Sequence, residues 1–143
     1  MRSVIAPEDL WRFGWSPRGM ASILASVGFL IWISLSVWSG ATAEFGLGLN
    51  AAWDTGAYYY FGVPLMALAV GFAAFVRPSR PWRWPLALVG GHQLGVLLVG
   101  LGMQSLVSLI LLTLVLAVLL SVLFTIPALI GAVTRLYLAE RTH

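Results

Sequence analysis

Long apolar stretches separated by short polar segments dominate the chain. Residues 20–38 and 57–76 each form one apolar run, and a helix needs about 20 such residues to cross a hydrocarbon core of roughly 30 Å. The run over residues 85–133 is much longer. A straight helix of that length would extend about 74 Å at 1.5 Å per residue, more than twice the thickness of the core. This third run must therefore turn back on itself.

The turn is predicted at residues 102–105, Gly-Met-Gln-Ser, because two polar side chains and a glycine that suits a helix end stand together there. Dividing the run at this point gives spans of about 85–101 and 106–133. The sequence thus predicts an all-α integral membrane protein, a four-transmembrane-helix bundle that forms a single membrane domain over residues 1–143.

The first polar segment predicts two helix starts. Pro7 suits the first position of a helix, and the acidic residues that follow it suit the first turn, so residues 7–15 are expected to form a short amphipathic helix at the membrane surface. Ser16 followed by Pro17 predicts an N-cap and a first-turn proline for the first spanning helix. Its apolar run exceeds the 7 to 15 residues typical of a signal peptide, so we interpret it as a true span.

Arginine positions give the expected orientation. With four spans, all eight arginines fall on the same side of the membrane as both termini. Because positively charged loops stay in the cytoplasm, both termini are predicted to be cytoplasmic, and the short loops favour a bacterial inner membrane. The eight residues are Arg2, Arg12, Arg18, Arg77, Arg80, Arg83, Arg135 and Arg141.

Composition excludes several classes of protein. Hydrophobic residues make up 60% of the chain and charged residues 9%, against about 45–50% and about 25% in ordinary soluble domains. These values rule out a soluble enzyme and a disordered chain. Cysteine is absent, which excludes disulfides and thiolate ligands. The arginines form no run, so no nucleic-acid partner is predicted.

His92 is the one titratable side chain expected at membrane depth, about 10 Å from the inner boundary, and Gln93 follows it. Matching depths makes Ser26, Ser121 and Thr125 its candidate neighbours. One interpretation is a set of hydrogen bonds that joins the helices; the other is a functional histidine in a polar pocket. A lone histidine with no spaced ligand set predicts neither a metal nor a cofactor.

Three further groups are candidates for contacts. Gly91 and Gly95 form a Gly-x-x-x-Gly pair suited to close helix packing. The arginines of the inner turn, Arg77, Arg80 and Arg83, could bind anionic lipid head groups. The outer segment offers Glu44, Trp53, Asp54 and Tyr58 for a partner protein, or else a helix cap with aromatic anchors at the interface.

No carboxylate or arginine lies within any predicted span, which disfavours an ion-coupled carrier and leaves no paired carboxylates for hydrolysis. An enzyme is therefore not favoured, and no catalytic residue is predicted. We expect a small non-enzymatic inner-membrane protein, an accessory or assembly subunit or a homo-oligomer, that acts through helix packing. The alternative is a small-solute transporter or channel formed at an oligomer interface around His92.

Overall fold

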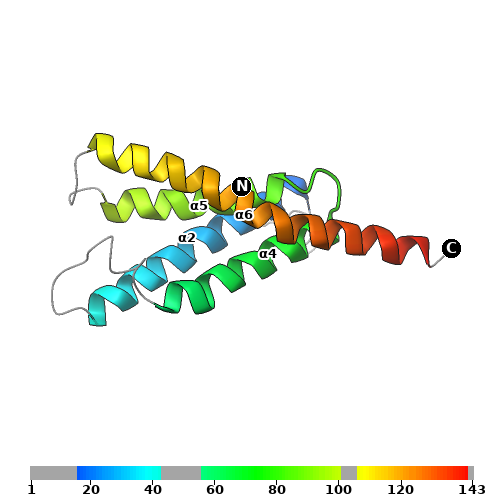
Figure 1. Cartoon of the computed structure of the whole chain (residues 1–143), viewed down its shortest axis with the longest axis horizontal. Coiled ribbons are helices and arrows are strands. Elements are labelled where there is room, and N and C mark those ends of the chain that lie inside the picture. Colours follow the sequence, from blue (N-terminus) through cyan, green and yellow to red (C-terminus); the bar gives the residue numbers. More distant parts are fainter. Residues whose placement is uncertain (1–15, 43–55, 101–105, 142–143) are drawn as a thin grey trace, which may run out of the picture.

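The computed structural model describes residues 16–42, 56–100 and 106–141, and every element in these ranges is helical (Figure 1). The predicted surface helix 7–15 and the predicted turn 102–105 lie outside the described residues. The elements are α2 (Pro17–Thr42), the π-helix η1 (Tyr58–Gly62), α4 (Val63–Val76), α5 (Arg83–Gly100) and α6 (Leu106–Glu140).

The bounds of these helices follow from local sequence signals. The amide of Gly19 donates to the Ser16 hydroxyl at 3.0 Å, so the predicted N-cap of the first spanning helix is confirmed. The third apolar run is divided into α5 and α6, which pack side by side (Figure 1). α6 continues to Glu140, past the span end expected at residue 133, because nothing in the polar tail interrupts the helix.

The helices pack as two parallel pairs. α2 has its most extensive contacts with α5, and α4 has its most extensive contacts with α6. Within each pair both helices run in the same direction, since the connecting segments return the chain to the starting end. α5 also contacts α4 and α6. α5 and α4 therefore each contact the three other long helices of the described bundle.

Glycines allow each pair to approach at the level of the backbone. A Cβ atom on Gly91 would overlap the carbonyl oxygen of Ala25 in α2, and one on Gly28 would overlap that of Leu88 in α5. In the other pair, a Cβ on Gly131 would overlap the carbonyl oxygen of Gly71. Small residues at such crossings let dispersion forces hold helices together where lipid removes the hydrophobic driving force.

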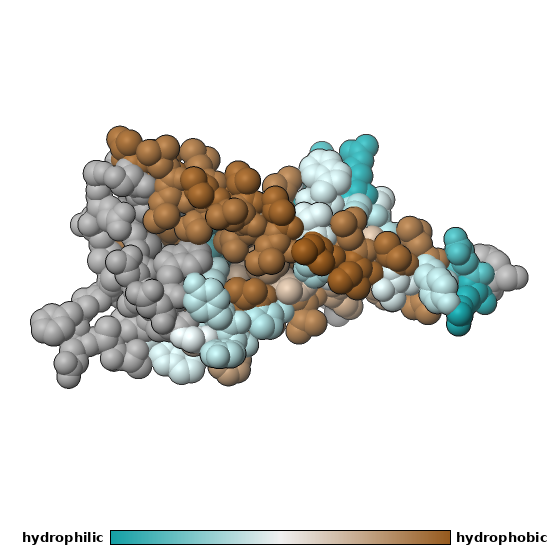
Figure 2. All heavy atoms as spheres, viewed as in Figure 1, coloured by the Kyte–Doolittle hydropathy of each residue, from teal (hydrophilic) through white to brown (hydrophobic). Residues whose placement is uncertain are grey.

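Three helices of the described chain are long and apolar enough to cross a membrane: Pro17–Trp38, Tyr58–Val76 and Ile110–Glu140. α5 is not among them, since it carries Arg83, His92 and Gln93 within its 18 residues. Figure 2 shows apolar residues covering much of α6, while the most hydrophilic residues gather towards the end of the molecule that holds the C-terminus.

Charged side chains of the described ranges share that end. Arg18 lies at the start of α2, Arg77 at the end of α4 and Arg83 at the start of α5, while Arg135 and Glu140 lie in the last part of α6. These helix ends gather at the right of Figure 1. We call this end of the bundle the arginine end, and the other the opposite end.

Candidate functional site

Three ring side chains from three different helices meet inside the bundle. Trp32 of α2, Tyr58 of η1 and His92 of α5 are 0%, 1% and 0% exposed. The Tyr58 hydroxyl lies 3.2 Å from Nε2 of His92, within hydrogen-bonding distance. The Trp32 ring packs edge-on against both, with centroids 5.0 Å from His92 and 6.0 Å from Tyr58. We call these three residues the aromatic cluster.

A π-helix places Tyr58 in this cluster. η1 spans Tyr58–Gly62 and passes directly into α4. Tyr58 is buried, whereas its neighbours Tyr59 and Tyr60 are exposed. π-helical turns are rare and occur frequently at functional sites. Since the turn changes the helical phase, nothing in the run of three tyrosines indicated which one points inward.

Gly95 provides the space that the cluster needs on α5. A Cβ atom at this position would lie 2.9 Å from Cδ1 of Trp32. Gly91, one turn earlier, contacts the backbone of α2. The structure thus places both residues of the predicted Gly-x-x-x-Gly pair on the face of α5 that meets α2.

Gln93 lies next to His92 on a different face of α5. Its side chain is 7% exposed, and neither amide atom has a hydrogen-bond partner among the described residues. Val89 and Val96, which share its side of the helix, are also buried. A buried carboxamide without a partner is costly and calls for an explanation.

Other members of the predicted polar cluster occupy different surroundings. Ser26 is exposed on α2. The Thr125 hydroxyl donates to the Ser121 carbonyl within α6 at 2.7 Å, and both residues are partly buried. The structure therefore pairs His92 with Tyr58, a partner that depth matching from the sequence did not identify.

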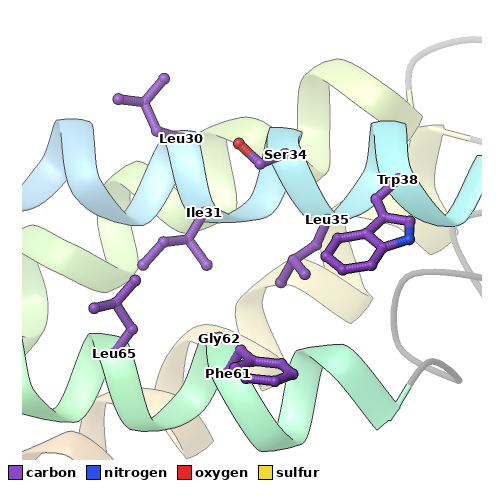
Figure 3. Close-up of a pocket in the computed structure, with 8 residues that line it drawn as sticks. All are labelled: Leu30, Ile31, Ser34, Leu35, Trp38, Phe61, Gly62 and Leu65. Atoms are coloured by element: carbon purple, nitrogen blue, oxygen red, sulfur yellow. The ribbon is translucent and has the colours of Figure 1, made fainter.

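Two shallow apolar grooves flank the cluster. One, of about 300 Å³, lies between α2 and the η1–α4 helix, with Leu35 and Leu65 extending into the gap between the two helices (Figure 3). The other, of about 430 Å³, lies between α2 and α5 and includes Ser26 and Gly91. The first groove is lined by Leu30, Ile31, Ser34, Leu35, Trp38, Phe61, Gly62 and Leu65.

Hydrogen bonds to backbone carbonyls hold the turn between α4 and α5. The indole nitrogen of Trp84 donates to the Arg77 carbonyl at 3.1 Å, and the Arg83 amide donates to the Arg80 carbonyl at 3.1 Å. Arg80 adopts a φ of 57°, which is uncommon for a residue with a side chain. The Arg80 and Arg83 side chains are exposed, and Arg77 is partly exposed.

The remaining sequence candidates divide between described and undescribed parts. Glu44, Trp53 and Asp54 lie outside the described residues, whereas Tyr58, expected at the outer surface, is buried in the aromatic cluster. No group of His, Cys, Asp and Glu in the described ranges could hold a metal ion. Comparison with protein-family models, curated proteins and solved structures gives no match.

Proposed function

We propose that this chain is a four-span membrane protein in which α5 provides the fourth span. α5 is polar for a span, but its polar residues His92 and Gln93 are buried against the other helices, and a bundle can shield such residues from lipid. The shared position of the described arginines supports an orientation with this end, and both termini, in the cytoplasm. The size and short loops fit a bacterial inner membrane.

Within that membrane, the protein acts as a non-enzymatic accessory or assembly subunit, or as a homo-oligomer, through packing of its helices. The observation that carries this proposal is the incomplete burial of α6. Only 17% of its most apolar window is buried, against 33% for Pro17–Trp38 and 28% for Tyr58–Val76. Such a long, uncovered apolar helix offers a lateral surface to another protein within the bilayer.

The face of α6 that points away from the bundle is well defined. Leu120, Phe124 and Ala128 are buried against the other helices. Val115, Val118 and Val122 are exposed and follow one another along the helix at spacings of three and four residues. We call these three valines the α6 stripe. They are branched, rigid side chains that pack well against a facing helix.

Photocrosslinking in native membranes tests this proposal. The chain has no cysteine, so Val115→Cys, Val118→Cys and Val122→Cys can each carry one benzophenone maleimide. We expect all three to give an adduct of one defined protein mass, twice that of the chain for a homo-oligomer. Leu68→Cys on α4, also exposed, is the matched control and should give no such adduct. Lipid adducts alone from all four positions would contradict the proposal.

A second function, a small-solute transporter or channel at an oligomer interface, draws support from the buried polar groups. His92 and Tyr58 lie within hydrogen-bonding distance inside the bundle and Gln93 is buried beside them in the chain, and polar residues inside a membrane bundle often mark substrate or ion pathways. Four helices enclose little space for a lumen. This function would therefore need several copies of the chain.

A further inference from the structure

Buried polar side chains are unevenly distributed along the bundle. From the middle towards the opposite end, the core contains Ser36, Tyr58, His92, Gln93 and Thr113. Towards the arginine end, the described core side chains are apolar, among them Leu24, Ala74 and Ala128. The described core thus offers hydrogen-bonding groups in one half of the bundle and apolar side chains in the other.

Gln93 is the member of this polar half that the fold leaves without a partner. Both atoms of its carboxamide are buried and unbonded in the described structure. In hydrocarbon no solvent is present to satisfy them, so a partner must come from inside the bundle. A carboxamide has two donors and one acceptor oxygen to fill.

Counting residues from the helix ends places Thr113 of α6 near the level of Gln93. Gln93 is seven residues before the end of α5, and Thr113 is seven residues after the start of α6. Because α5 and α6 are adjacent and antiparallel, Gln93 lies about 10 Å from the last residue of α5 and Thr113 about 10 Å from the first residue of α6. Thr113 is buried and donates its hydroxyl hydrogen to the Ile110 carbonyl at 2.8 Å. Its oxygen lone pairs can still accept a hydrogen bond.

We propose that the α5–α6 interface binds water at Gln93, with the Thr113 hydroxyl as the second ligand. An internal water needs two to four polar partners, and the carboxamide donors, its oxygen and the Thr113 oxygen provide that number. The described core around them contains no carboxylate, arginine or lysine. A neutral ligand fits this site, because an ion would have no opposite charge to offset the loss of its hydration.

The sign of one stability change distinguishes a hydrated from a dry site. Gln93→Met replaces the carboxamide by an apolar side chain of similar length. If a water molecule is hydrogen-bonded to the amide, Gln93→Met removes those hydrogen bonds and leaves the water with too few partners. Tm of the detergent-solubilised protein should then fall by several degrees. A dry site predicts that Tm rises, because the substitution would remove a buried amide that has no hydrogen-bond partner and therefore destabilises the fold. Leu94→Met, at the adjacent exposed position, is the control and should leave Tm unchanged.

Thiol reactivity gives a second, independent readout. Thr113→Cys and Ala128→Cys place the single thiol of the chain at two buried positions on α6, both facing the bundle. Only a thiolate reacts, and it needs a hydrated environment to form. We expect methyl methanethiosulfonate to modify Thr113→Cys at least tenfold faster than Ala128→Cys. Equal rates, or a rise of Tm in Gln93→Met, would overturn the proposal. Neither outcome depends on the α6 stripe, so the proposed subunit role is tested separately.

Discussion

Replacing Gly91 by alanine is expected to destabilise the bundle by about 2–3 kcal/mol, because the added methyl group must push α2 away from α5. The obstacle is the carbonyl oxygen of Ala25. Backbone cannot rotate aside as a side chain can, so the whole helix pair has to separate and loses dispersion contacts along its length. Thermal unfolding in a mild detergent, followed by size-exclusion chromatography, measures the effect.

Gly90 provides the matched control for this substitution. It is the adjacent residue on the same helix, it is exposed, and a Cβ atom there would have no neighbour within 4 Å. Gly90→Ala should therefore be neutral, or stabilising by up to about 1 kcal/mol through helix propensity. Equal destabilisation by the two variants would show that α5 does not pack on α2 through Gly91.

Replacing Trp32 by alanine is expected to cost about 3 kcal/mol, the lower end for loss of a buried aromatic residue. We take the lower end because the unfolded reference in a membrane is still surrounded by hydrocarbon, so the loss is one of packing. Trp32 is fully buried and contacts Tyr58, His92 and Gly95. Its removal leaves a cavity at the point where α2, η1 and α5 meet.

Trp38, on the same helix and 61% exposed, is the control for that experiment. Trp38→Ala should change Tm much less, since its ring lies at the rim of the groove shown in Figure 3. A smaller loss of stability in Trp32→Ala than in Trp38→Ala would contradict the arrangement of the aromatic cluster.

The helices could be predicted from the sequence because their signals are local. Apolar runs of sufficient length located the long helices, and Ser16 with Pro17 located the start of α2. The division of the third run was predicted from polarity alone, and α5 ends at Gly100 while α6 begins at Leu106. Each of these features depends on residues that are neighbours in the chain.

The aromatic cluster could not be predicted because it depends on helical phase and on contacts between distant segments. His92 was identified from its polarity, but its partner Tyr58 was assigned to the outer surface with its exposed neighbours. The π-turn of η1 rotates Tyr58 inward, and no propensity rule signals such a turn. Thr113 was not identified at all, since a single threonine in an apolar helix commonly bonds its own backbone.

Topology in sealed right-side-out vesicles tests the central claim, which is that the chain crosses the membrane four times with the arginine end inside. Ser79→Cys, Glu140→Cys and Gly56→Cys each place one thiol at an exposed position, the first two at the arginine end and the third at the opposite end. An impermeant maleimide should label Gly56→Cys in intact vesicles, and the other two only after the vesicles are opened. Labelling of Ser79→Cys and Glu140→Cys from opposite sides would contradict the claim.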